Sequence, residues 1–388
     1  MTFDQFLWSE IDRIKAAGLY RELRTVGSPQ GAEMICDGRP LVNFSSNDYL
    51  GLAGDRRLAV AARGAVDDAG TGSGASRLIS GNHRFHEALE EAVAGFKGCE
   101  AALTFSSGYA AAVGTLPALF GKSDVLILDK LSHASLVDGA RLSGAVVRIF
   151  PHNHLEKLES HLRWAREKHP QAKVGVVIES VYSMDGDLAP LREIVELKNR
   201  FGAWLFLDEA HGVGVLGERG RGLADALGLA EEVEIQMGTF GKALGVAGAY
   251  ICGRASLRDY LLNRARSFIF STAPPPSVAM AARAAVELLN SNEGEILVAR
   301  LREVRGTLAE LLRFPGADSA IFPVLVGDER KAMAVSERLR KAGYFVPAVR
   351  FPTVAAGSAR LRITVTAAHT REHLENFVRA LEQALREE

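Results

Sequence analysis

The sequence predicts an α/β protein whose central sheet is mostly parallel, with helices on both faces and a smaller α+β domain at its C-terminal end. Short apolar runs alternate with amphipathic helical patterns through the middle of the chain. Runs such as VGVVIE and WLFLD lack the alternation of polar and apolar residues that a strand with one wet face shows. Apolar strands separated by amphipathic helices are typical of a parallel sheet that is covered on both faces. The expected strands are 101–105, 124–128, 145–150, 173–179, 204–208 and 234–237.

The pattern changes after the proline run 274–276, where long helical patterns come first and fewer strands follow. Leading into the sheet, an N-terminal helix is expected over about residues 3–17 and an extended segment over 41–44. We therefore expect a helix and extended segment over 1–45, a large α/β domain over 46–275 and a small α+β domain over 276–388. In the small domain the expected helices are 277–290, 293–312, 331–342 and a C-terminal amphipathic helix, and the expected strands are 321–326 and 359–365.

Composition excludes several classes of protein. The 46 Lys and Arg residues balance 47 Asp and Glu residues, so a broad basic surface for nucleic acid is not expected. The 47% hydrophobic and 24% charged content is that of an ordinary globular chain of 388 residues. Three scattered cysteines form no disulfide framework and no CxxC metal motif, which favours a reducing compartment.

No membrane segment is expected. The longest uncharged run, 101–121, contains serine, glycine, threonine and proline, so a buried strand, turn and helix fit it better than a membrane span. The first residues, MTFDQFLWSEIDRIK, mix charged and apolar residues and lack the apolar core of a signal peptide. A cytoplasmic location is the resulting expectation.

Polar residues follow five of the predicted strands directly. In an open parallel sheet, ligands bind beyond the carboxyl ends of the strands, so these residues are candidates for one composite site. They are Ser106–Tyr109, Ser132–His133, Ser180–Asp187, Asp208–His211 and Gly238–Lys242.

Lys242 is the candidate for covalent chemistry. It lies in GTFGKALGVAGAY, after an apolar strand and among small residues. Most lysines lie on the surface, and a solvated loop lysine is the competing interpretation. A lysine in an apolar pocket has a lowered pKa and can form a Schiff base.

Asp208 ends the apolar strand WLFLD, where a carboxylate is costly unless it meets a cation or hydrogen-bond donors. A helix N-cap or a salt bridge is the ordinary reason for such an aspartate. The functional alternative is the Asp–pyridinium pair of pyridoxal phosphate (PLP) enzymes, in which His211 would donate to the cofactor phenolate.

Two helix starts could contribute to the same site. Ser106–Tyr109 opens a helix after a strand, where backbone N–H groups favour a phosphate, although small polar residues there are also common caps. His133 at another helix start is either an ordinary polar residue or a ring that stacks on an aromatic cofactor.

Other motifs are set aside. The GxGxxG match over 212–217 is crowded by Asp208–His211, and the motif alone is a weak signal for a dinucleotide. The pairs His83/His86 and His152/His154 lack further ligands at metal-binding spacing, so no metal site is predicted.

Six segments together resemble the α-oxoamine synthases, which are PLP-dependent enzymes of fold type I. The resemblance runs from about residue 21 to beyond 368, and it predicts that the large domain binds PLP. The segments are NFSSNDYLGL, GTGSGASRLISGNHRFHEALE, LSHASLVDGARLS, ESVYSMDGDLAPL, LDEAHGVGVLGERGRG and TFGKALGVAGAY.

The resemblance implies a role for each matching residue. Lys242 would attach PLP, Asp208 would keep the pyridine nitrogen protonated, and His133 would stack on the ring. His211 and Ser183 would bind the phenolic oxygen or its neighbours. The remaining roles are phosphate binding by Gly108, Tyr109, Thr239 and, from a second subunit, Thr272, and substrate contacts by Arg21, Asn47, His133, Arg350 (to the amino-acid carboxylate) and Thr353.

Within the family, SGASRLISGNH and PTVAAGSARLRITVTAAHT are most similar to enzymes of biotin synthesis that condense L-alanine with a pimeloyl thioester. The resemblance implies a homodimer, and it leaves open whether pimelate arrives on coenzyme A or on acyl carrier protein. The nearest alternative is a family member that uses glycine or serine with another acyl-CoA. A non-catalytic homologue is disfavoured because Lys242 is present, and a nicotinamide enzyme would rest on the GxGxxG match alone.

Overall fold

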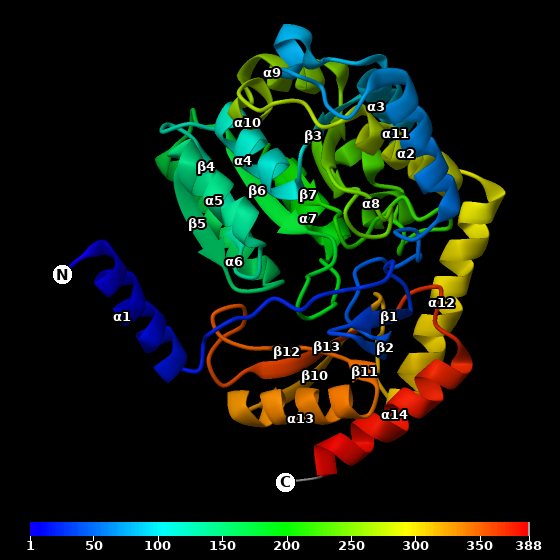
Figure 1. Cartoon of the computed structure of the whole chain (residues 1–388). Coiled ribbons are helices and arrows are strands. Elements are labelled where there is room, and N and C mark those ends of the chain that lie inside the picture. Colours follow the sequence, from blue (N-terminus) through cyan, green and yellow to red (C-terminus); the bar gives the residue numbers. More distant parts are fainter. Residues whose placement is uncertain (387–388) are drawn as a thin grey trace.

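A central seven-stranded sheet forms the core of the chain, as the computed structural model shows for residues 1–386 (Figure 1). Its strand order is β3-β9-β8-β7-β6-β4-β5, and only β9 runs antiparallel to its neighbours. The predicted α/β class with a mostly parallel sheet is confirmed. The strands are β3 (Ala101–Phe105), β4 (Val125–Asp129), β5 (Val146–Phe150), β6 (Val174–Glu179), β7 (Trp204–Asp208), β8 (Ile235–Thr239) and β9 (Ala249–Gly253).

Both faces of this sheet are covered, and β4 shows how. Successive side chains of a strand point to opposite faces. Val125 and Ile127 belong to one buried cluster, whereas Leu126 and Leu128 belong to another. The helices of the first cluster include α3 (Arg84–Lys97), α6 (Leu155–Lys168), α7 (Leu191–Arg200) and α11 (Pro276–Leu289); those of the second are α4 (Gly108–Leu119), α5 (Ala134–Ser143), α9 (Ala255–Arg264) and α10 (Arg266–Ile269).

The C-terminal part forms a second, smaller layer below the sheet in Figure 1, joined to it by the long helix α12 (Asn292–Leu312). Here an antiparallel sheet of order β10-β13-β12 packs with helices α13 and α14. The predicted α+β texture of this part is confirmed. The elements are β10 (Ile321–Gly327), α13 (Glu329–Lys341), β11 (Tyr344–Phe345), β12 (Ala348–Val349), β13 (Ala359–Thr364) and α14 (Arg371–Arg386).

The N-terminal strands belong to this smaller layer. The hairpin of β1 (Glu33–Cys36) and β2 (Arg39–Asn43) pairs in parallel with β11, where Val42 faces Tyr344. The extended segment expected at 41–44 therefore lies in β2 except for its last residue. The boundaries proposed at 45/46 and 275/276 stay a prediction.

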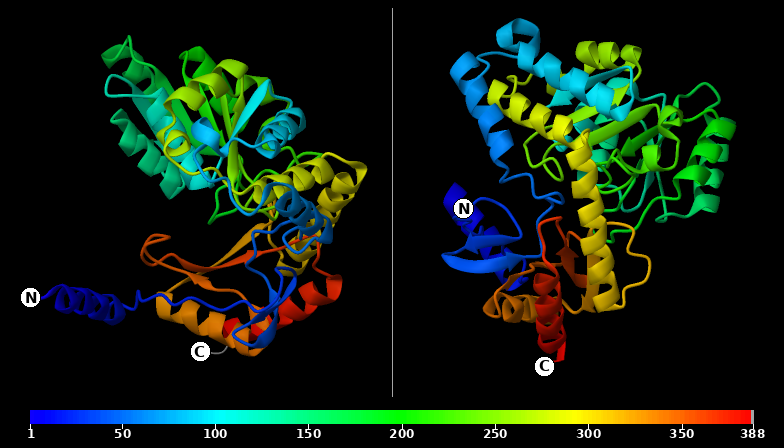
Figure 2. Two further views of the ribbon diagram at one scale, coloured as in Figure 1. Left: turned by 45° about the horizontal axis from the view of Figure 1, so that its top comes forward. Right: turned by 90° about the vertical axis from the view of Figure 1, so that its right-hand side faces the viewer.

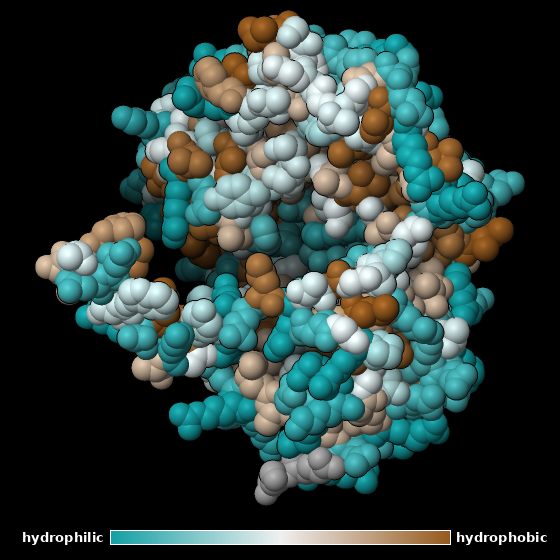
Figure 3. Space-filling model, in the orientation of Figure 1, coloured by the Kyte–Doolittle hydropathy of each residue, from teal (hydrophilic) through white to brown (hydrophobic). Residues whose placement is uncertain are grey.

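Helix α1 (Phe3–Ala16) projects away from the rest of the chain, and it has no buried residue (Figures 1 and 2). After it come α2 (Arg56–Ala69), the π-helical turn η1 (Arg77–Gly81) and, later, the short helices α8 (Leu223–Ala226) and η2 (Ala230–Glu232). Within residues 1–386 no helix is long and apolar enough to cross a membrane. Figure 3 shows that the surface is hollowed between the sheet and the smaller layer.

Candidate active site

The carboxyl ends of the parallel strands face the smaller layer, and two buried carboxylates end adjacent strands there. Glu179 ends β6 and Asp208 ends β7, and the two residues are register partners. Both are buried, at 2% and 4% exposure. Asp208 accepts a hydrogen bond from the Ala210 amide at 2.8 Å, and Glu179 accepts one from the His133 amide at 2.6 Å. The sheet therefore holds two acidic groups at one point of its edge.

Lys242 lies in the turn after β8, beside these carboxylates. Although the residue as a whole is partly exposed, its amine is surrounded by protein, and this desolvation lowers the pKa of Lys242. The charges of Asp208 and Glu179 act in the opposite direction. The two carboxylates are therefore close enough for their charges to act on the Lys242 amine.

Burial also raises the pKa of both acids. For Asp208 desolvation is the largest cause, and the charge of Lys242 opposes it. For Glu179 desolvation is again the largest cause, and the nearby charge of Asp208 raises the pKa further. The signal for Glu179 in the sequence was the same as for Asp208, since both follow strands of continuous apolar residues, but Asp208 alone was selected.

His133 and His211 complete the group around Lys242. His133 caps the start of α5, and its Nδ1 lies 2.8 Å from the Ser135 hydroxyl. Burial of the ring lowers its pKa, with Asp208 and Lys242 as the nearest charged influences. His211 is buried, and desolvation followed by the charge of Lys242 holds its pKa well below the ordinary value. The structure thus brings four predicted residues to one place.

Two residues that the sequence analysis missed, Tyr49 and Arg362, surround His211. The Tyr49 hydroxyl lies 2.6 Å from Nδ1 of His211, and the Arg362 guanidinium donates to the same hydroxyl at 3.5 Å. Arg362 also donates through Nε to the Ser183 carbonyl at 2.5 Å. Arg362 comes from β13 of the smaller layer, so this layer supplies a cation to the site.

The start of α4 lies at the same strand ends. Ser107 caps the helix by accepting from the Ala110 amide at 3.1 Å, and a side chain at Gly108 would meet the Met237 methyl at 3.3 Å. The Tyr109 hydroxyl donates to Asp138 at 2.8 Å, so its backbone amide, not its phenol, is available to a phosphate. The Thr239 hydroxyl donates to the Gly248 carbonyl at 2.9 Å.

The predicted substrate residues occupy two places. Asn47 and Lys242 line one cavity of about 580 Å³. Arg350 donates to the carbonyls of Gly18 and Tyr20, which adjoin Arg21. Thr353 lies in the turn that follows Arg350, since its amide donates to the Arg350 carbonyl at 3.0 Å. These contacts place Arg350 and Thr353 of the smaller layer next to the segment that contains Arg21.

Thr272 lies elsewhere. It is exposed and forms an isolated antiparallel bridge with Ser76. Its assignment to the site of a second subunit stays a prediction.

The set-aside motifs make contacts within the fold. Gly212 and Gly222 pack against the buried Glu209, where an added Cβ would come within 2.3 Å and 2.5 Å of its carboxylate. His86 donates through Nε2 to the Pro274 carbonyl at 2.8 Å, and His152 bridges two aspartates. The described part of the chain contains no group of three or more His, Cys, Asp or Glu residues that could hold a metal ion.

Comparison with known proteins identifies the family. The profile of the class I and II aminotransferases matches residues 39–381. The chain is a member of the class I and II aminotransferase family. Among its aminotransferase-family relatives, an 8-amino-7-oxononanoate synthase of Geobacter sulfurreducens is 48% identical over 377 residues, which is 96% of each chain. The predicted membership of the α-oxoamine synthases is thereby confirmed.

Solved structures of this aminotransferase family share the fold. Serine palmitoyltransferase from S. paucimobilis, solved with PLP bound, has a TM-score of 0.91 and 29% identity, and the match covers 97% of this chain and 96% of that one. An 8-amino-7-oxononanoate synthase from Francisella tularensis has a TM-score of 0.75 and 27% identity, over 88% of this chain and 97% of that one.

Proposed function

We propose that this chain is a PLP-dependent acyltransferase that condenses L-alanine with a pimeloyl thioester. The products are 8-amino-7-oxononanoate, CO2 and the free thiol carrier, which is a step of biotin synthesis. The observation that carries the proposal is the likeness to the Geobacter sulfurreducens synthase over nearly the whole chain, at 48% identity. The site independently supplies the lysine and the carboxylate that PLP chemistry requires.

The residues present fit PLP. The amine of Lys242 and the carboxylates of Asp208 and Glu179 are close enough for their charges to influence one another, so one ring could meet both the amine and a carboxylate. The first turn of α4 offers backbone N–H groups at the same strand ends, where a phosphate is stabilised. Lys242 would hold the aldehyde carbon, Asp208 the ring nitrogen, and the amides of Gly108 and Tyr109 the phosphate, with Thr239 and, from a second subunit, Thr272.

When bound, PLP supplies an electron-accepting ring that stabilises the charge left on Cα when a bond there breaks. Asp208 accepts a hydrogen bond from the Ala210 amide, which restricts its carboxylate, and it would hold the ring nitrogen protonated. Because its pKa is lowered, the Lys242 amine gives up its own proton readily and is suited to take the Cα proton of alanine. His133 would cover one face of the ring, and His211 and Ser183 would lie at its phenolic oxygen.

The carboxylate of alanine has two candidate partners. Arg350 is the residue that the family resemblance implies, and its guanidinium is held by two carbonyls near Arg21. Arg362 is buried at 8% exposure and influences the pKa of both Lys242 and His211. Asn47 would line the pocket, and Arg21 and Thr353 would contact substrate.

Product analysis tests the proposal. The purified enzyme is incubated with L-alanine and either pimeloyl-CoA or pimeloyl-acyl carrier protein, and in parallel with glycine or serine and other acyl-CoAs. Mass spectrometry should detect 8-amino-7-oxononanoate from the alanine reactions. A preference for glycine with acetyl-CoA, or for serine with a long acyl-CoA, would instead assign the chain to a different branch of the family. The use of serine with a long acyl-CoA is the second candidate function. It is supported by the similarity of this chain's fold to that of serine palmitoyltransferase, at a TM-score of 0.91.

A homodimer is part of the proposal, because the role of Thr272 requires a second subunit. Its exposure is compatible with contact across an interface. Light scattering of the purified protein measures the mass, and Thr272→Ala should weaken PLP binding without changing that mass.

A further inference from the structure

Two cysteine thiols meet at a point of the large domain that the proposed reaction does not use. Cys99 lies in the turn between α3 and β3, and Cys252 lies within β9. Although 153 positions separate them, their sulfur atoms are 3.6 Å apart and share a hydrogen bond. Cys252 is buried at 1% exposure, whereas Cys99 is partly exposed. The third cysteine, Cys36, lies in β1 with the smaller layer.

Cys99 lines a cavity of about 800 Å³. The cavity lies at the amino ends of β6, β7 and β8, because Lys173, Trp204 and Ile235 stand there. Lys242 follows the carboxyl end of β8, so this cavity is at the opposite edge of the sheet from the proposed active site. A small molecule can therefore reach Cys99 without entering the catalytic cleft.

The two thiols differ in their surroundings. The hydrogen bond with Cys252 and the charge of Lys97 lower the pKa of Cys99 against the effect of its burial. The hydrogen bond with Cys99 and burial hold the pKa of Cys252 well above the ordinary value. The thiolate is the nucleophile in thiol chemistry, so Cys99 is the thiol that reacts first and Cys252 the one that follows.

We propose that Cys99 and Cys252 form a reversible redox site that reacts with small disulfides entering this cavity. The Cys99 thiolate attacks one sulfur of the small disulfide and releases one small thiol, which leaves a mixed disulfide on Cys99. Cys252 attacks the Cys99 sulfur, which breaks the mixed disulfide, and the Cys252 proton passes to the departing sulfur, so that the second small thiol is released. The protein has lost two protons and two electrons, and the small disulfide has gained them and become two thiols.

The backbone around the pair is compatible with this closure. A disulfide requires the sulfur atoms to approach from 3.6 Å to about 2.05 Å. Cys252 is fixed between two neighbouring strands, where it pairs with Ala102 and Gln236. Cys99 follows Gly98, which ends α3 in a left-handed conformation. The movement therefore falls on the turn at 98–100.

The test uses the full-length holoenzyme in buffers with rising ratios of glutathione disulfide to glutathione. Peptide mapping without reduction should find a Cys99–Cys252 cross-link that dithiothreitol removes. In Cys252→Ala, the mixed disulfide should accumulate on Cys99, and Cys36→Ala should form the cross-link as the wild type does. Accumulation of the mixed disulfide in the wild type, or no modification of Cys99 at any ratio, would overturn the proposal.

A second measurement needs no substitution. Iodoacetamide should label Cys99 in the folded wild-type protein about tenfold faster than Cys36 or Cys252. Equal rates at the three cysteines would contradict the predicted order of reaction. Absorbance of bound PLP, followed in the same samples, reports that the protein stays folded. Because neither measurement depends on substrate turnover, this proposal and the proposed function fail separately.

Discussion

The hydroxyl of Tyr49 lies 2.6 Å from Nδ1 of His211, and this contact fixes the orientation of a buried imidazole beside Lys242. Tyr49 itself is fully buried, and Arg362 and Asn47 hold its hydroxyl from two further sides at 3.5 Å and 3.2 Å. Because Nδ1 is engaged in this way, Nε2 is the nitrogen that His211 presents to a ligand. Tyr49 is thus a positioning residue that acts through His211.

Removal of this hydroxyl should reduce turnover more than substrate affinity. In Tyr49→Phe, His211 loses one hydrogen bond worth about 0.5–1.5 kcal/mol, which corresponds to a fall in kcat of about two- to thirteenfold. The KM for alanine should change less than kcat, because Asn47 and Arg362, which also contact the Tyr49 hydroxyl, keep their own side chains in the variant. Steady-state kinetics measures both constants, and Tyr20→Phe, at an exposed tyrosine near the N-terminus, is the control. A change in KM alone would contradict the positioning role.

Much of the fold could be predicted because the buried strands have a local signature. In β6 all six residues are buried, and the run VGVVIE shows this as unbroken apolar character before its final glutamate. The polar residues that follow these strands could also be selected, since the topology of a parallel sheet places them at one edge. This reasoning selects Lys242, Asp208, His133 and His211 from the sequence.

The features that the sequence does not predict depend on contacts between distant parts of the chain. Strand β9 was missed because it follows a glycine-rich loop and is defined by its antiparallel pairing with β3 and β8. Arg362 lies in β13, and it reaches Ser183 only because the smaller layer packs against the strand ends. No local pattern reveals that Cys99 and Cys252 meet. Pairings of this kind are properties of the folded chain and leave no periodic signal.

Lys242→Ala should abolish both covalent attachment of PLP and turnover. The wild-type protein should absorb at about 420 nm. Borohydride should remove this band and leave the cofactor covalently attached to the chain. In the variant, mass spectrometry after borohydride should find no such adduct. Lys173→Ala is a matched control, because Lys173 lies at the opposite edge of the sheet in an ion pair with Asp124 at 3.1 Å. An adduct that persists without Lys242 would show that another amine binds the cofactor.

Gly175→Ala should destabilise the central sheet. Gly175 lies in β6, and an added Cβ would come within 2.6 Å of Phe120 and 2.8 Å of Leu126. Overpacking of this kind costs about 1–3 kcal/mol in the free energy of unfolding. Urea unfolding measures the loss, and Gly64→Ala in α2 is the control. No atom lies within 4 Å of a Cβ at Gly64, so there the better helix propensity of alanine should add up to about 1 kcal/mol.

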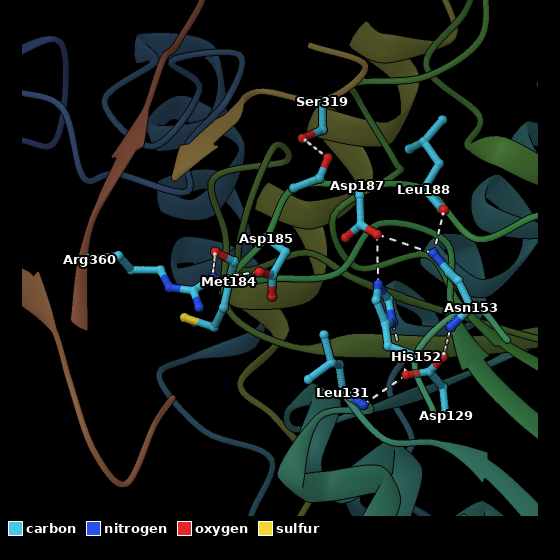
Figure 4. A network of polar contacts seen from close by, with 11 residues as sticks. Asp129, Leu131, His152, Asn153, Met184, Asp185, Asp187, Leu188, Ser319 and Arg360 are labelled. Carbon is cyan, nitrogen blue, oxygen red and sulfur yellow. Dashed lines mark hydrogen bonds and ion pairs between the residues drawn. The ribbon is translucent and has the colours of Figure 1, made fainter. Parts of the chain in front are cut away.

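The loops beyond β4, β5 and β6 are joined by His152, whose two ring nitrogens lie 3.0 Å from Asp129 and 2.6 Å from Asp187 (Figure 4). Asn153 binds Asp187 as well, and nearby Ser319 and Arg360 connect the smaller layer to residues 184–186. Burial alone would lower the pKa of His152, but hydrogen bonds and charge from the two aspartates raise it from 6.5 to about 10. The folded protein therefore binds this proton more tightly than the unfolded chain does.

This difference predicts how stability depends on pH. A group with a raised folded pKa contributes fully below its unfolded pKa, so the contribution of His152 is complete below about pH 6.5 and lost as the pH rises to about 10. Allowing for partial solvent screening, the loss amounts to about 2 kcal/mol. In His152→Gln this proton is absent, so the difference in free energy of unfolding between wild type and variant should be largest near pH 6 and should shrink toward pH 10. His161→Gln is the control, because burial lowers the pKa of His161, and its difference from wild type should stay constant above pH 7. A wild-type–His152→Gln difference that is equally constant across this range would mean that His152 does not carry a proton between the two aspartates.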